Sequence, residues 1–316
     1  MNQSKLTPHT AGISHLSYYL PSERVDIDEA ATRLNLTEEQ LRLYKTIRRL
    51  KYVRLSTESA EEMAITVGRK ALADSGLEPT QIDAVVFFHS VYNIGLAPRG
   101  FVGRLQHELG LNRALGLSVT GQGCATVNSA IRVSRNMILA GSAETVLILG
   151  ADGLQDSQQR VLDGITLVGD GASAIIMRKD CATNRLVEIS SFDEGYFHCV
   201  EDWTKEDRDN FDLVYVIATV RLVHRTLRRA NLSLSEIALL VPHNVNYSSW
   251  DRILALLDFN TERFFGENIA LNGHAYGTDI IVNLADAIEA KRIQPGEYAM
   301  LMSAGIGTLG CTIIQH

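Results

Sequence analysis

One thiol, Cys124, lies among glycines and small residues where a predicted helix begins. Residues 121–130 read Gly-Gln-Gly-Cys-Ala-Thr-Val-Asn-Ser-Ala, and apolar residues then recur at helical spacing up to residue 138. A cysteine in the first turn of a helix is near free backbone N–H groups and the positive end of the helix dipole, which favour the nucleophilic thiolate. Flanking glycines let a substrate carbonyl approach the backbone. A buried core cysteine is the alternative, but the strand-turn-helix pattern favours a catalytic thiol.

Two histidines occur in comparable contexts further along the chain. His274 lies in residues 272–279, Asn-Gly-His-Ala-Tyr-Gly-Thr-Asp, which also precede a predicted helix. His243 follows an apolar strand that stops at Pro242, and strand ends are where sites of α/β proteins gather. Either histidine could instead be an ordinary loop or strand-end residue. A thiol and an imidazole brought together would form a nucleophile and its base.

Composition limits the classes of protein to consider. The 316 residues are 46% hydrophobic and 21% charged, as in soluble globular proteins, and no apolar run could span a membrane. Residues 1–10 lack the apolar core of a signal peptide, so we expect a cytoplasmic protein with no membrane partner. The net charge of −7 argues against nucleic acid as a partner. Four scattered cysteines and the absence of phosphate-binding, dinucleotide-binding and HExxH motifs predict reduced thiols, no metal and no cofactor.

Helical and strand patterns alternate along the chain. Residues 27–50 and 59–75 are predicted to be helical, and short apolar runs predict strands at 84–89, 146–150 and 172–177. Alternating strands and helices are typical of an α/β architecture. No linker rich in proline, glycine or serine separates two bodies, so we expect the parts to pack as one unit.

An internal repeat divides the chain. Leu72 and Ile82 align with Leu227 and Ile237 at a constant offset of 155 residues, and both segments read helix, turn, strand. Residues 141–149 likewise resemble residues 295–302. General similarity between αβ units is the alternative explanation. We predict two related halves, 1–180 and 181–316, whose turns carrying Cys124 and His274 would meet near a pseudo-twofold axis.

Further motifs accompany Gly123-Cys124-Ala125 in order along the chain. They are residues 13–21, 71–83, 149–152, 169–172 and 242–246, and the glycine loop Gly305-Ile306-Gly307. Together these motifs resemble the ketosynthase III family (β-ketoacyl-acyl carrier protein synthase III) of the thiolase superfamily over nearly the whole chain. The resemblance implies an α/β, thiolase-like fold of five layers, αβαβα, with two pseudo-twofold-related halves. It also implies acyl chemistry through a thioester on Cys124.

Further expectations follow from the same resemblance. The donor would be an acyl-CoA or an acyl carrier protein thioester, and the enzyme would be a homodimer. The backbone N–H of Cys124 and the loop Gly305, Ile306 and Gly307 would bind the oxyanion. We also expect Asn246, from the motif 242–246, and His198, which lies near the join of the two halves, to line the site. The apolar loop 92–98 would lie at the twofold interface, because such a loop is costly to expose to water.

One departure from the family pattern bears on the reaction. The family usually has Gly-Asn-Thr at the start of the second-half helix, where the asparagine and the strand-end histidine stabilise the enolate formed by decarboxylation. Here His274 replaces that asparagine, and Asp279 follows five residues later. His-x4-Asp resembles a divergent branch that transfers acyl groups to hydroxyl or amine acceptors in natural-product biosynthesis. Such transfer needs a base, which a histidine held by a carboxylate provides and an asparagine does not.

Asp279 is one residue too far from His274 for a shared helix face. We expect Gly273 and Gly277 to supply the non-helical residues that bring the two side chains into contact. In this mechanism Cys124 attacks the donor, His274 deprotonates a small-molecule acceptor, Asp279 orients His274, and His243 assists the oxyanion or the first proton transfer.

Two other functions fit parts of the pattern. Cys124, His243 and His274 together resemble the site of condensing enzymes, in which two neutral imidazoles could donate to an enolate and a carbon–carbon bond would form. A non-catalytic partner subunit is a third possibility, against which the cysteine and both histidines argue. For carrier docking, Ser248 stands where the family often has arginine. Basic residues cluster within 45–54 and 221–229, where they could attract an acidic carrier or form solvated helix faces.

Overall fold

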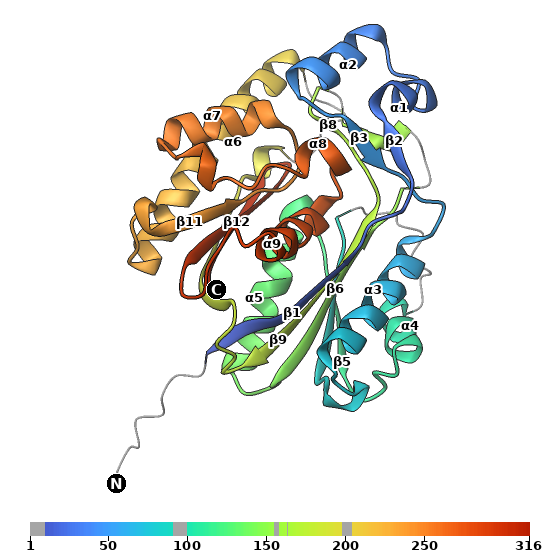
Figure 1. The fold of residues 1–316 in the computed structure, drawn as a ribbon, viewed down its shortest axis with the longest axis vertical. Coiled ribbons are helices and arrows are strands. Elements are labelled where there is room, and N and C mark those ends of the chain that lie inside the picture. Colours follow the sequence, from blue (N-terminus) through green and yellow to red (C-terminus); the bar gives the residue numbers. More distant parts are fainter. Residues whose placement is uncertain (1–9, 91–99, 155–157, 163, 198–203) are drawn as a thin grey trace.

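The computed structural model describes residues 10–90, 100–154, 158–162, 164–197 and 204–316, and Figure 1 shows its fold. Nine strands form one sheet in the order β11-β12-β13-β10-β1-β9-β6-β4-β5. Their bounds are β1 (Ala11–Tyr19), β4 (Ala84–Phe88), β5 (Leu115–Val119), β6 (Thr145–Asp152), β9 (Gly171–Lys179), β10 (Arg185–Asp193), β11 (Ile237–Val241), β12 (Tyr298–Gly305) and β13 (Thr308–Gln315). Two small sheets pair β2 (Arg24–Asp26) with β3 (Tyr52–Arg54) and β7 (Val161–Leu162) with β8 (Thr166–Leu167).

The strand order is palindromic about the junction of β1 and β10. Outward from β1, β9 pairs antiparallel with β1, β6 pairs antiparallel with β9, and β4 pairs parallel with β6. Outward from β10, the neighbours β13, β12 and β11 pair in the same sense and sequence. Strand β5 then adds in parallel to β4 at one edge. The sheet therefore consists of two pseudo-twofold-related half-sheets, as predicted.

Helices cover the half-sheets in three layers. The helices are α1 (Ile27–Arg33), α2 (Glu38–Arg42), α3 (Ala60–Ser75), α4 (Phe101–Glu108), α5 (Thr126–Leu139), α6 (Lys205–Ala230), α7 (Tyr247–Leu257), α8 (Ile269–Asn272) and α9 (Asp279–Glu289). Helices α5 and α9 contact strands of both half-sheets, whereas α3 and α4 cover the first half-sheet from outside and α6, which packs on α7, covers the second (Figure 1). This arrangement confirms the predicted αβαβα layers.

Local sequence explains the main elements. Strand β6 is buried along its whole length, as expected for a strand covered by helices on both faces. Helix α3 begins with a capping box, in which Ser59 and Glu62 satisfy free backbone N–H groups, and it ends at Gly76 with φ of +65°. Helix α6 begins with the equivalent box of Thr204 and Asp207.

Most predicted elements are present. The strands expected at 84–89, 146–150 and 172–177 are β4, β6 and β9, and the helix expected at 59–75 is α3. The region 27–50 is less regular than predicted, because α1 and α2 are short and a π-helical turn, Leu43–Ile47, follows. The division into 1–180 and 181–316 stays a prediction. None of the described helices is long and apolar enough to cross a membrane.

Candidate active site

Cys124 lies in a tight turn that packs against the glycine loop. The thiol belongs to a single 3-10 turn, Gly123–Ala125, which leads directly into α5. Gly123 has φ of +50°, which disfavours residues with side chains. A Cβ atom on Gly305 would lie 2.6 Å from the Gln122 carbonyl oxygen and 3.1 Å from the Cys124 nitrogen. The backbone of the loop therefore approaches the nucleophile turn as closely as only a glycine allows.

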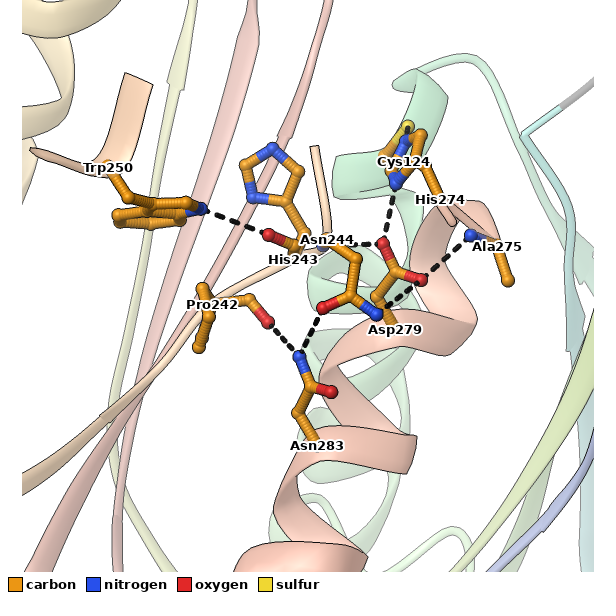
Figure 2. A network of polar contacts seen from close by, with 9 residues as sticks. All are labelled: Cys124, Pro242, His243, Asn244, Trp250, His274, Ala275, Asp279 and Asn283. Carbon is orange, nitrogen blue, oxygen red and sulfur yellow. Dashed lines mark hydrogen bonds and ion pairs between the residues drawn. The ribbon is translucent and has the colours of Figure 1, made fainter. Parts of the chain in front are cut away.

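His274 joins the thiol to a carboxylate, as Figure 2 shows. Its Nε2 atom lies 3.0 Å from Cys124 Sγ, and its Nδ1 atom lies 2.5 Å from Asp279 Oδ2. His274 and Asp279 are only 2% and 1% exposed, so most of the surface around these contacts is protein rather than water. Because the carboxylate accepts from Nδ1–H, the other ring nitrogen is left to exchange a proton with the sulfur.

A second 3-10 turn makes this contact possible. His274 sits in an extended segment whose backbone N–H donates to the Leu167 carbonyl at 3.1 Å. The chain then turns through Tyr276–Thr278, and Asp279 is the first residue of α9. Gly273 has φ of +69°, as expected, but Tyr276, with φ of +52°, supplies the second left-handed residue in place of Gly277. Gly277 is needed for space instead, because a Cβ there would lie 2.8 Å from the Phe88 ring.

The Asp279 carboxylate is held by three further donors. The Ala275 backbone N–H donates to Oδ1 at 2.8 Å, and the Asn244 backbone N–H donates to Oδ2 at 2.7 Å. The Asn244 amide lies 3.4 Å from Oδ1. Together with the His274 contact, each of the two carboxylate oxygens has two partners. These contacts fix the orientation of the carboxylate.

His243 lies two residues beyond the end of β11, close to the strand end at which the sequence pattern predicted it. Its side chain is buried, and its ring centre lies 5.7 Å from that of His274. Its backbone carbonyl accepts a hydrogen bond of 3.0 Å from the Trp250 indole of α7. The structure thus brings Cys124, His243, His274 and Asp279 together from distant parts of the chain.

The two imidazoles differ in their proton affinity. Burial, followed by repulsion from a protonated His274, lowers the pKa of His243 to about 3, so this ring is neutral at physiological pH. Burial alone would also lower the pKa of His274, but the negative charges of Cys124 and Asp279 outweigh burial and raise it well above its usual value. His274 is therefore the stronger base, and His243 is a neutral hydrogen-bonding group.

One cavity of about 660 Å³ gives access to these groups. Cys124, His243 and His274 line it, and so do the predicted residues Asn246 and Gly305, Ile306 and Gly307. Asn246 has a second role, because its side-chain oxygen accepts from the Ser249 N–H at 2.8 Å and caps α7. His198 and the loop 92–98 lie outside the described residues.

The basic clusters prove to be largely bonded within the protein. Lys45 pairs with Asp28 at 2.6 Å, and Arg49 pairs with Asp251. Arg48 differs, because it lines the cavity and donates from Nη1 to the Ser248 hydroxyl at 2.6 Å. A guanidinium therefore reaches Ser248, which lies in the first turn of α7. In the second cluster, Arg221, Arg225 and Arg228 line a separate open groove on α6.

Among the described residues, no cysteine other than Cys124 lines this cavity. Cys181 and Cys311 are free thiols, and burial raises the pKa of Cys311 to about 12. Cys199 lies outside the described residues. Within the described part of the chain, no group of three histidine, cysteine or acidic side chains is arranged to hold a metal ion.

Several residues of the site could not be recognised from the sequence pattern. Asn244 stood within the quoted motif 242–246, but its contact with Asp279 was not foreseen. Tyr276 lines the cavity with its ring centre 5.4 Å from His274. Asn283 is fully buried on α9, and a polar residue among Ile280, Ile281, Val282 and Leu284 was the signal that could have revealed it.

Comparisons with known proteins agree with this architecture. Residues 120–195 match the model of 3-oxoacyl-[acyl-carrier-protein] synthase III, and residues 227–316 match the model of its C-terminal part. The β-ketoacyl-[acyl-carrier-protein] synthase III of Listeria monocytogenes is 26% identical over 322 residues, which cover 96% of this chain and 98% of that protein.

Solved structures show the same fold. The 3-oxoacyl-[acyl-carrier-protein] synthase III of Aquifex aeolicus superposes with a TM-score of 0.83 at 20% identity, covering 97% of this chain and 100% of the other. ChlB3, an acyltransferase, superposes with a TM-score of 0.84 at 18% identity, covering 97% of both chains. The chain therefore belongs to the ketosynthase III-like (3-oxoacyl-acyl carrier protein synthase III) family of the thiolase superfamily and is a transferase of acyl groups.

Proposed function

We propose that this enzyme moves an acyl group from a CoA or acyl carrier protein thioester, through a thioester on Cys124, to a hydroxyl or amine acceptor. The observation that carries the proposal is the position of His274, which contacts Cys124 Sγ at 3.0 Å and Asp279 at 2.5 Å. This arrangement is that of a nucleophile, a base and an orienting carboxylate.

In the first half-reaction, His274 takes the thiol proton and the sulfur attacks the donor carbonyl carbon. The bond from that carbon to the donor sulfur then breaks, and His274 returns the proton to the departing thiol. Backbone N–H groups beside Gly305 and the neutral His243 would stabilise the oxyanion. The product is acylated Cys124.

In the second half-reaction, His274 takes a proton from the acceptor as its oxygen or nitrogen attacks the thioester carbon. The carbon–sulfur bond to Cys124 breaks, and the proton passes to the sulfur, which restores the enzyme. Asp279 stabilises the imidazolium in both steps, and its charge is one of the causes that raise the pKa of His274.

The cavity is compatible with a thioester donor. A volume of about 660 Å³ is typical of a small-molecule site, and Arg48 at its wall suits a phosphate on a pantetheine arm. The arginine-lined groove on α6 could attract an acidic carrier protein.

Decarboxylative condensation is the second candidate, and His243 favours it. This neutral imidazole lines the same cavity as His274, with the ring centres 5.7 Å apart. Two imidazoles that donate to one enolate oxygen could form a carbon–carbon bond as a histidine and an asparagine do in the family.

Two assays separate the candidates. The enzyme is first incubated with a panel of acyl thioesters, and intact-mass spectrometry detects acylated protein before and after alcohols or amines are added. We expect an adduct that these acceptors discharge as esters or amides. The second assay measures carbon dioxide from a malonyl thioester. Release of carbon dioxide with extension of the acyl chain by two carbons would replace acyl transfer with condensation.

A further inference from the structure

We propose that Asn283 is a positioning residue for both histidines, because its amide holds the segment 242–244 that carries His243 and orients Asp279. This inference rests on the proposed function of the His274–Asp279 pair. Asn283 lies on α9, one turn beyond Asp279, and Figure 2 shows its side chain beneath the segment.

The Asn283 amide has a fixed orientation. Its Nδ2 atom donates to the Pro242 carbonyl at 2.7 Å and to Asn244 Oδ1 at 2.8 Å, so both amide protons are used. Its Oδ1 atom accepts from the Asn268 amide at 3.0 Å. A rotated amide would place an oxygen against two other oxygens, which is unfavourable in a fully buried position.

The bond to Asn244 transmits this orientation to the base. Because Asn283 occupies Asn244 Oδ1, the opposite end of that amide faces Asp279, where Nδ2 lies 3.4 Å from Oδ1. The Asn244 backbone N–H also donates to Asp279 Oδ2, the oxygen that contacts His274. Asn283 therefore lies two contacts from Asp279 and three from the imidazole of His274.

The bond to Pro242 acts on the other histidine. Asn283 donates to the carbonyl of Pro242, which belongs to the peptide group before His243. The Trp250 indole donates to the carbonyl of His243 itself, which belongs to the peptide group after it. The peptide groups on both sides of His243 are thus anchored by different helices, α9 and α7. One residue, Asn283, consequently contributes to the placement of both imidazoles in the cavity.

The surroundings of Asn283 indicate that the amide is kept for these bonds. Its neighbours on α9, Val282 and Leu284, are buried and apolar, and an aliphatic side chain would suit such a position. A buried amide is unfavourable unless it is hydrogen-bonded. Here every donor and acceptor of the side chain is engaged, and two of the three partners belong to the segment that bears His243.

The test compares Asn283→Ala with a matched control. Asn128→Ala removes another buried amide, on α5, whose partners are Thr312 and Ser303 rather than the histidine segment. Both variants lose buried hydrogen bonds, so both should be less stable. We expect Asn283→Ala alone to slow discharge of acyl-Cys124, by roughly 5- to 100-fold, the rate equivalent of one or two lost buried bonds.

Nuclear magnetic resonance titration of the His274 ring provides a readout that does not depend on the reaction. Because Asp279 helps to raise the pKa of His274, a misplaced carboxylate should move the midpoint toward lower pH. We expect this shift in Asn283→Ala and not in Asn128→Ala. An unchanged midpoint in Asn283→Ala would overturn the inference, whether the enzyme proves to transfer or to condense.

A double-variant comparison completes the test. If Asn283 acts through Asp279, its replacement should have little further effect on discharge in an Asp279→Asn background. If the effects of Asn283→Ala and Asp279→Asn on the discharge rate were fully additive, Asn283 would not act through Asp279. Should Asn283→Ala fail to fold, Asn244→Ala breaks the same connection one step closer to Asp279, and the same shift of the His274 midpoint is expected.

Discussion

The Cys124 sulfur and the His274 Nε2 atom lie 3.0 Å apart, although 150 residues separate them in the chain. Each belongs to the short segment that precedes a central helix, α5 for the thiol and α9 for the imidazole. The two 3-10 turns at these helix starts contact one another. The pairing of nucleophile and base is therefore a product of the pseudo-twofold packing rather than of any local motif.

Replacement of Cys124 by alanine should abolish acyl loading. Intact-mass spectrometry after incubation with an acyl thioester would show the adduct on the wild type only. Cys181→Ala is the control and should load normally, since this thiol lies outside the cavity. Cys311 should remain unlabelled, because burial raises its pKa to about 12. An undiminished adduct on Cys124→Ala, mapped to no other cysteine, would refute the thioester assignment.

His274→Ala should retain a detectable acyl adduct but lose its discharge to the acceptor. Removal of a general base typically costs about 10² to 10⁴ in rate. Asp279→Asn should slow discharge by no more than His274→Ala, because the carboxylate acts through the imidazole. Rapid-quench mass spectrometry of pre-acylated enzyme measures both rates. Discharge of the His274→Ala adduct at the wild-type rate would exclude this residue as the base.

His243 should make the fold sensitive to acid. Its pKa is about 3 when folded and about 6.5 when unfolded, so between these values the unfolded chain binds the extra proton. Stability contributed by the neutral ring is thus present above about pH 6.5 and is lost as the pH falls toward 3. Urea unfolding at several pH values should show a shallower acid limb for His243→Gln than for the wild type. Equal slopes would contradict the burial of a neutral ring.

His274 should have the opposite effect above neutrality. Its folded pKa is raised, so the folded state keeps a proton that the unfolded chain releases near pH 6.5. The stability of the imidazolium pair is present below that pH and is lost as the pH rises through the folded value. His274→Gln should therefore flatten the alkaline limb of the same unfolding series. An alkaline limb as steep as that of the wild type would show that the pair is uncharged.

The enzyme should be a homodimer that associates along β5. Strand β5 is one of the two edge strands of the described nine-stranded sheet, and it bears an exposed apolar side chain, because Leu115 is 55% exposed. Such an edge favours pairing with a second copy. Sedimentation at micromolar concentration should give a dimer mass, which Leu115→Lys lowers and Leu256→Lys, at an exposed leucine of α7, does not. A monomeric wild type would contradict the prediction.

Local patterns predicted the elements of the fold but not how the site is connected. The apolar runs at β4 and β6 and the helical spacing at α3 are encoded by adjacent residues, which is why their positions could be predicted. The approach of Asn244 to Asp279 depends on how β11 meets α9, and that packing is determined by the whole central layer. No spacing within either segment encodes it.

A motif can also have a structural role that its sequence does not disclose. Asp170, from the motif 169–172, forms a buried ion pair of 2.9 Å with Arg160 and accepts the Ser56 backbone N–H at 2.7 Å. It does not line the cavity. These bonds join three segments that approach one another only in the folded chain, so the sequence alone could not separate this aspartate from a catalytic one.

Because of the palindromic sheet, the turnover rate of the enzyme should depend on how precisely its two half-sheets and their central helices are positioned relative to each other. Cys124 and His274 lie in the segments just before α5 and α9, two helices of the central layer that come from distant parts of the chain. A slip of one helix past the other by a fraction of an ångström would part sulfur from nitrogen while every strand stayed paired. Mild denaturant or heat should therefore abolish the acyl-transfer activity before the circular dichroism signal of the secondary structure changes.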